Sequence, residues 1–186
     1  MPEQDGLKVG IAFEAVRQCH QDVGRLIADF DGYMSKARWT RLWTRDAVTW
    51  GVSRAAYSPH WMAKMIYRMY QNEDAFPGVV EGFNIRFFSD DRSLKEPRLV
   101  VGRAKYDVPP NKTVAKVAQT WDFDEGFGKW CNAQPDDLGK VLSCDNKERN
   151  VERMLVIGVN LYSIQRLDDV TDKIQQIRHQ FEAQDE

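Results

Sequence analysis

The sequence contains little cysteine and no long apolar run. Its three cysteines, Cys19, Cys131 and Cys144, are an odd number without the spacing of a disulfide framework, so reduced thiols are expected. No apolar stretch approaches the roughly 20 residues that a membrane-spanning helix needs. The start of the chain also lacks the basic segment and leucine-rich segment of a secretory signal. We therefore expect a soluble, cytoplasmic protein that does not span or bind a membrane.

Motifs that define enzymes are also missing. The chain has three histidines, and none lies in a recognisable catalytic arrangement. Ser53 lacks the second glycine of a nucleophile elbow, and Gly126 and Gly128 lack the third glycine of a dinucleotide-binding loop. The cysteines and histidines do not follow a zinc-binding spacing. These absences weigh against an enzyme without deciding the question, and we predict no metal and no cofactor.

The composition is typical of one globular domain. The chain has 186 residues, of which 42% are hydrophobic and 29% charged. A chain of this length buries about two-thirds of its unfolded surface, so it needs neither metal nor disulfide to fold. It contains no linker, repeat or low-complexity tract. We therefore expect residues 1–186 to form a single domain.

Helical periodicity is clearest at the two ends of the chain. Residues 8–36 carry apolar side chains at alternating four- and three-residue steps, which predicts one long helix. The members of this stripe are Ala12, Val16, Cys19, Val23, Leu26, Phe30 and Tyr33. A C-terminal helix is expected to follow a cap at Asp168 or Asp169, with a narrow apolar seam over residues 167–181.

A second helix is predicted over residues 58–71. Ser58 and Pro59 suit the first positions of a helix, and Met62, Met65 and Met69 recur at helical spacing. Residues 37–57 are ambiguous between helix and strand.

The middle of the chain has the patterns of β-structure. Strands are predicted at 83–88, 99–106, 113–121 and 154–164. Their short connections favour antiparallel neighbours, and a short helix is expected near 136–142. The predicted fold is α+β: a mainly antiparallel sheet of about four to five strands, with a long N-terminal helix, a second helix and a C-terminal helix.

The strongest functional indication is a basic, tryptophan-containing segment at residues 36–68. It has seven cations and one acid, although the whole chain has a net charge of −2 and a pI of about 6.0. Cations can neutralise phosphate or carboxylate, and tryptophan can stack on a planar ligand. The plainer alternative has more weight: the tryptophans enter the core and the cations pair with acids of the same chain. The near-neutral pI weighs against a dedicated nucleic-acid binder without excluding one.

The predicted ligand-binding residues come from this segment. They are Arg41, Trp43, Arg45, Trp50, Arg54, His60, Trp61 and Met65. We expect a pocket between the sheet and the helix at 58–71, where they would contact a small anionic or aromatic ligand. The first turn of that helix, with His60 protonated, could hold an anion. A solvated histidine and ordinary core packing of the methionines are the plainer interpretations.

A second candidate is the acidic group formed by Asp122, Asp124 and Glu125. Carboxylates can bind Mg²⁺ or Ca²⁺ or act as acid and base. The spacing does not match a calcium-binding loop, because the loop glycine and the final glutamate are misplaced. A solvated turn is therefore the expected structure.

Three functions remain open. The first choice is a non-enzymatic ligand-binding or sensor-like domain. The second is a protein–protein interaction module, such as an adaptor or inhibitor, in which the seams at 12–33 and 167–181 pair within the fold or across a homodimer. The third is a metal-assisted enzyme that acts on a phosphorylated or nucleic-acid substrate.

Overall fold

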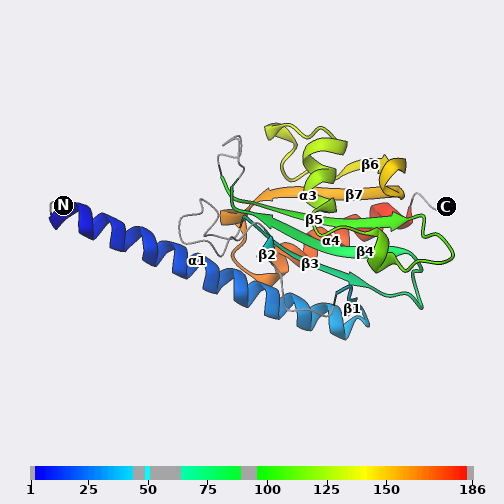
Figure 1. The fold of residues 1–186 in the computed structure, drawn as a ribbon, viewed down its shortest axis with the longest axis horizontal. Coiled ribbons are helices and arrows are strands. Elements are labelled where there is room, and N and C mark those ends of the chain that lie inside the picture. Colours follow the sequence, from blue (N-terminus) through cyan, green and yellow to red (C-terminus); the bar gives the residue numbers. More distant parts are fainter. Residues whose placement is uncertain (1–2, 44–48, 51–63, 89–95, 184–186) are drawn as a thin grey trace.

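The computed structural model describes residues 3–43, 49–50, 64–88 and 96–183, and it has an α+β fold (Figure 1). An antiparallel sheet forms its centre, in the order β1-β3-β4-β5-β7-β6, and β2 pairs with β3 beside that path. The strands are β1 (Thr40–Arg41), β2 (Thr49–Trp50), β3 (Met65–Gln71), β4 (Val79–Arg86), β5 (Arg98–Tyr106), β6 (Leu142–Asn146) and β7 (Val151–Asn160). The predicted fold class is confirmed, with more strands than expected.

Helices cover both faces of the sheet. The long helices α1 (Glu3–Lys36) and α4 (Leu167–Glu182) pack on one face. The other face is covered by α2 (Val114–Val117), α3 (Asp122–Glu125) and the π-helical turn η1 (Gly126–Trp130). Figure 1 shows α3 and α4 on opposite sides of the sheet. The strands between these layers are buried on both faces, which explains their nearly continuous apolar sequence.

Three 3₁₀ turns complete the described chain. They are η2 (Pro135–Asp137), η3 (Lys147–Arg149) and η4 (Leu161–Ser163). None of the described helices is both long and apolar enough to cross a bilayer.

A buried ion cluster lies between the sheet and α4. The Glu81 carboxylate is fully buried and accepts hydrogen bonds from Arg103 at 2.7 Å and from Arg178 at 2.6 Å. The Arg103 guanidinium lies 4.8 Å from the Phe76 ring centroid and 4.9 Å from that of Phe181. These contacts join β4, β5 and α4 inside the core.

Only the C-terminal half of α1 is packed against the sheet. Val23, Phe30 and Met34 are buried in the core, because the four- and three-residue steps place them on one side of the helix. The N-terminal part of α1 extends past the sheet (Figure 1). There Leu7 and Ile11 are 68% and 61% exposed. The predicted helix over 8–36 is confirmed, and the structure begins it at Glu3.

The predicted helix over 58–71 is wrong in its described part. Residues 65–71 form β3, which pairs with β4 from Met65 opposite Arg86 to Gln71 opposite Val80. A four-residue step between Met65 and Met69 puts both side chains on one side of a helix, but also on one face of a strand. The spacing therefore did not distinguish the two structures. Residues 58–63, including Met62, lie outside the described residues.

Other boundaries also differ from the prediction. The prediction of a third strand at 113–121 is wrong, because this segment contains α2. The strand that pairs with β5 on the side away from β4 is β7. The helix expected near 136–142 is a 3₁₀ turn followed by strand β6. Within the ambiguous segment 37–57, the described pieces β1 and β2 are strands.

The C-terminal helix is confirmed as α4, but its start differs. Arg166 is the N-cap residue, and the Asp169 carboxylate reaches back to it. Asp169 accepts hydrogen bonds from the backbone N–H groups of Gln165 at 2.8 Å and Arg166 at 3.1 Å. These bonds hold the pKa of Asp169 below its usual value.

Candidate functional site

The predicted basic, tryptophan-containing site is described only in part. Arg41 is exposed on β1 and Met65 is buried on β3. Trp43 is half-buried: its Nε1–H donates to the Ala115 carbonyl at 3.2 Å, and its ring meets Tyr67 edge to face at 5.8 Å. The hollow beside Arg41 and Trp43 has a volume of about 10 Å³. That volume is about enough for one water molecule.

The remaining residues of that prediction cannot be placed around the hollow. Trp50 pairs with Met65 across β2 and β3, which fixes its backbone position alone. Arg45, Arg54, His60 and Trp61 lie outside the described residues. Their role in ligand binding stays a prediction.

Two residues of the basic segment follow the plainer alternative. Trp39 is buried and stacks on Phe76 at 5.7 Å. The Arg68 guanidinium donates to the Asp31 carboxylate of α1 at 3.1 Å and 3.2 Å, and the Tyr70 hydroxyl also donates to it. Here tryptophan serves the core, and a cation pairs with an acid of the same chain.

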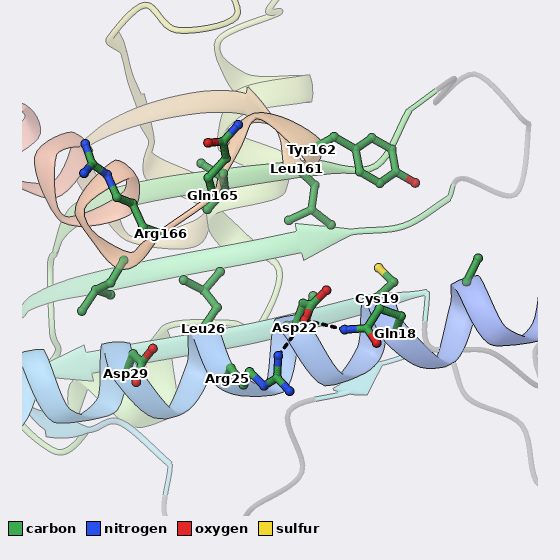
Figure 2. Close-up of a pocket in the computed structure, with 14 residues that line it drawn as sticks. Gln18, Cys19, Asp22, Arg25, Leu26, Asp29, Leu161, Tyr162, Gln165 and Arg166 are labelled. Carbon is green, nitrogen blue, oxygen red and sulfur yellow. Dashed lines mark hydrogen bonds and ion pairs between the residues drawn. The ribbon is translucent and has the colours of Figure 1, made fainter.

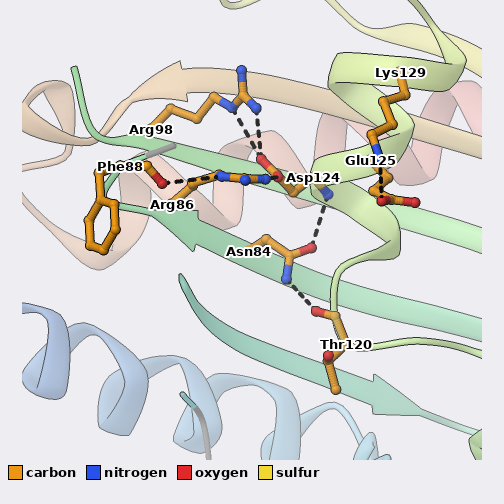
Figure 3. A network of polar contacts seen from close by, with 8 residues as sticks. All are labelled: Asn84, Arg86, Phe88, Arg98, Thr120, Asp124, Glu125 and Lys129. Atoms are coloured by element: carbon orange, nitrogen blue, oxygen red, sulfur yellow. Dashed lines mark hydrogen bonds and ion pairs between the residues drawn. The ribbon is translucent and has the colours of Figure 1, made fainter. Parts of the chain in front are cut away.

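The acidic residues at 122–125 do not form the expected solvated turn. Asp122 and Asp124 are 1% and 2% exposed, because α3 packs directly on the sheet. The Asp124 carboxylate accepts hydrogen bonds from Arg98 at 2.8 Å and from Arg86 (Figure 3). Its backbone N–H donates to the side-chain oxygen of Asn84 at 3.0 Å. The predicted solvated turn is therefore wrong, and Asp124 holds α3 on β4 and β5.

Asp122 lies in a less complete environment. One carboxylate oxygen accepts hydrogen bonds from the Tyr106 hydroxyl at 2.7 Å and the Gln119 N–H at 2.8 Å. The other oxygen is buried and has no hydrogen-bond partner. Burial raises the pKa of Asp122 to about 6. Among the residues that the structure describes, no three His, Cys, Asp or Glu side chains converge on a possible metal site.

The structure shows a larger pocket between α1 and the segment at 161–167 (Figure 2). Its volume is about 730 Å³, within the range of roughly 300–1,000 Å³ that is common for small-molecule sites. The residues that line it are Ala15, Gln18, Cys19, Asp22, Val23, Arg25, Leu26, Asp29, Leu161, Tyr162, Ile164, Gln165, Arg166 and Leu167.

The pocket has an apolar interior and a charged rim. Figure 2 shows Cys19 and Leu26 pointing from α1 toward the opposite wall, and Leu161 pointing back toward the helix. On the rim, the Asp22 carboxylate accepts a hydrogen bond from Gln18 at 2.9 Å and pairs with Arg25 at 3.3 Å. Burial, followed by the charge of Asp22, raises the pKa of the Cys19 thiol. Cys19 is therefore expected to be a slowly reacting thiol in the pocket wall.

Backbone hydrogen bonds fix the wall opposite α1. The Leu161 N–H donates to the Pro97 carbonyl at 2.9 Å, and the Ile164 N–H donates to the Leu161 carbonyl at 3.1 Å. The Asn160 side-chain oxygen accepts from the Tyr162 N–H at 2.9 Å. Together with the Asp169 cap on α4, these bonds give the wall a defined shape before any ligand binds.

The apolar stripe of the first helix contains a sequence signal for this pocket. Cys19 and Leu26 belong to the apolar stripe of the first helix, yet both are only half-buried. The most buried residues lie on an adjacent line of the helix, at Val23, Phe30 and Met34. The apolar stripe of α1 is therefore wider than its contact with the sheet requires, and the edge that carries Cys19 and Leu26 lines the pocket.

The chain was compared with protein-family models, with curated proteins and with solved structures, and none of the three comparisons found a significant match. Its function must therefore be argued from the residues and their geometry.

Proposed function

We propose that the protein is a non-enzymatic ligand-binding domain and that the pocket between α1 and residues 161–167 is its binding site. The observation that supports this proposal is a cavity of about 730 Å³ with an apolar interior and a charged rim. The ligand is a small molecule with an apolar body and an anionic or aromatic group.

The apolar body of the ligand is expected to lie against Leu26, Leu161 and Ile164. These side chains come from α1 and from the facing segment, so a ligand between them removes apolar surface of both walls from water. Each Å² of apolar surface removed from water contributes about 25 cal/mol before the costs of association are subtracted.

The anionic group of the ligand is expected to contact Arg25 and Arg166. Their side chains are 72% and 75% exposed, and their own ion pairs are long, at 3.3 Å to Asp22 and 3.8 Å to Asp169. Exposed pairs of this kind contribute roughly 0–1 kcal/mol. An anion can therefore replace an acid partner of either arginine at little cost.

A cytoplasmic location is part of this proposal. It is supported by the three cysteines, all of which are free thiols.

A second candidate, a protein–protein interaction module, is favoured by the extension of α1. Leu7 and Ile11 are exposed and are one helical turn apart. Counted in helical steps, they lie on the same side of α1 as Gln18, Asp22 and Arg25 of the pocket rim. A homodimer or another protein partner would cover this surface. If the protein forms a homodimer, sedimentation velocity should show self-association that Ile11→Glu abolishes. A protein that stays monomeric, and that captures no partner in a pulldown, would contradict this alternative.

Binding of an anionic aromatic probe tests the ligand-binding proposal. Anilinonaphthalene sulfonate has an aromatic body and a sulfonate, and its fluorescence rises in apolar sites. We expect saturable binding to the folded protein, weakened at least about tenfold by Leu26→Asp, because a buried charge destroys the apolar wall. Leu138→Asp is the matched control, since Leu138 is exposed and lies outside the pocket.

The arginine contribution needs its own pair of variants. Arg25→Gln combined with Arg166→Gln should weaken binding of the sulfonate by about threefold to tenfold, whereas Arg17→Gln should leave it unchanged. Arg17 lies on the same helix, is 57% exposed and does not line the pocket. Equal binding by the Leu26 and Leu138 variants, at unchanged melting temperatures, would refute the proposed site.

A further inference from the structure

Two cysteines lie close together on the face of the sheet opposite α1. Cys131 follows η1 and Cys144 lies on β6, and both are half-buried. They share one acceptor: the Gly126 carbonyl accepts from the Cys131 N–H at 2.8 Å and from the Cys144 thiol at 3.9 Å. Each thiol also shifts the pKa of the other.

A glycine allows this meeting. A Cβ atom at position 126 would lie 2.3 Å from the Met154 sulfur, so the absence of a side chain lets η1 pack closely on β7 without displacing Met154. Met154 is directly opposite Cys144 in the pairing of β7 with β6. Residues that face each other across antiparallel strands project to the same side of the sheet. The turn that places Cys131 therefore lies directly over Cys144.

The local chain can adjust to a covalent link. In the described sheet path β6 is an edge strand whose partner is β7, and its pairing is irregular between Cys144 and Asn146. An edge strand with a bulge can shift more easily than a strand held on both sides. A covalent link at Cys144 therefore needs less rearrangement of the sheet than one on a central strand would.

The thiols differ in acidity, which suits sequential exchange. The interaction with Cys144 lowers the pKa of Cys131, and the same interaction, followed by burial, raises the pKa of Cys144. Cys131 is thus the thiol that ionises first and acts as nucleophile, because the thiolate is the reactive form. Cys19, on α1, has a raised pKa and lines the ligand pocket.

We propose that Cys131 and Cys144 form a reversible intramolecular disulfide, a modification site separate from the ligand pocket, with a small disulfide such as oxidised glutathione as the oxidant. The Cys131 thiolate attacks one sulfur of the oxidant, whose S–S bond breaks and releases one glutathione thiolate. Cys144 then loses its proton to solvent and attacks the Cys131 sulfur of the mixed disulfide, which releases the second glutathione. Two electrons pass from the protein thiols to the oxidant, which is reduced to two thiols.

Thiol counting on the full chain tests this proposal. The reduced protein is equilibrated with mixtures of reduced and oxidised glutathione, quenched with acid, alkylated and weighed intact. We expect the oxidised protein to lose the mass of two hydrogen atoms and to retain one alkylatable thiol, at Cys19. Cys19→Ser should still form the disulfide. Cys131→Ser and Cys144→Ser should instead carry a single glutathione on the remaining member of the pair.

The same equilibrium in concentrated urea tests whether the fold brings the pair together. The folded chain holds both cysteines against the Gly126 carbonyl. The folded protein should therefore keep the disulfide when the ratio of reduced to oxidised glutathione is at least about tenfold higher than the ratio that the unfolded chain tolerates. An equal or more oxidising midpoint for the folded protein would overturn the proposal. So would a folded protein that retains three alkylatable thiols, or one that forms only mixed disulfides or intermolecular dimers.

Discussion

The buried carboxyl of Asp122 predicts an unusual dependence of stability on pH. Its pKa is raised from 3.8 to about 6, first by burial, although bonds from Gln119 and Tyr106 favour the ionised form. The folded state therefore binds the proton more tightly than the unfolded state. The stabilisation from this proton is complete below pH 3.8 and is lost as pH rises through about 6.

The size of the effect follows from the shift in pKa. A rise in pKa from 3.8 to about 6 corresponds to about 3 kcal/mol between the stability at low pH and the stability at high pH. Because the unfolded chain begins to ionise near pH 4, about 1.5 kcal/mol of this change is expected between pH 8 and pH 5. Asp122→Asn removes the titration and keeps the shape of the side chain, so it serves as the reference.

The assay is urea unfolding of the wild type and of Asp122→Asn at a series of pH values. The free energy of unfolding of the wild type should rise relative to the variant by about 1.5 kcal/mol from pH 8 to pH 5. Subtracting the two curves removes the contributions of other groups, such as Asp169, whose pKa is lowered and whose stabilisation falls in acid. Parallel curves, or a carboxyl resonance of Asp122 that titrates near 4 by NMR, would refute the reasoning.

Three substitutions test the packing. Gly102→Ala should destabilise the fold by about 1–3 kcal/mol in urea unfolding, because its Cβ would lie 2.3 Å from the Phe123 ring. Gly24→Ala, with nothing within 4 Å of the added carbon, should stabilise α1 by about 0.5–1 kcal/mol. If Gly24→Ala and Gly102→Ala changed the free energy of unfolding equally, the close packing of Phe123 on Gly102 would be contradicted. Glu81→Gln should lower the melting temperature strongly and cost about 3 kcal/mol or more, since it leaves the buried guanidinium of Arg103 and the partly buried guanidinium of Arg178 without their carboxylate. A loss below 1 kcal/mol would show that this cluster is less important than its burial suggests.

The sequence predicted the elements whose period is unambiguous. The long first helix and the last helix carry apolar residues at steps that only a helix places on one side, and both are present. The apolar run of β7 was also recognised, because a strand covered on both faces is apolar at nearly every position. These predictions depended on local pattern alone.

The failures came where local pattern permits two structures. A step of four residues fits a helix and a strand equally well, so Met65 and Met69 gave the wrong secondary structure for β3. The acids at 122–125 look solvated in sequence. Distant residues make the burial of two of them possible: arginines of β4 and β5 pair with Asp124, and Tyr106 and the Gln119 N–H donate to Asp122. The pocket combines α1 with residues 161–167, more than 130 positions away. No local signal joins these two walls.

Ligand mapping on the wild-type protein and on Leu26→Asp tests the central claim most directly. Small anionic aromatic compounds would be titrated into the labelled protein while amide shifts and the alkylation rate of Cys19 are recorded. The account predicts that bound compounds perturb Leu26 and Ile164 and protect Cys19, and that Leu26→Asp abolishes both effects. Compounds that bind while Cys19 stays fully reactive, with perturbations confined to the surface around Arg41 and Trp43, would contradict it.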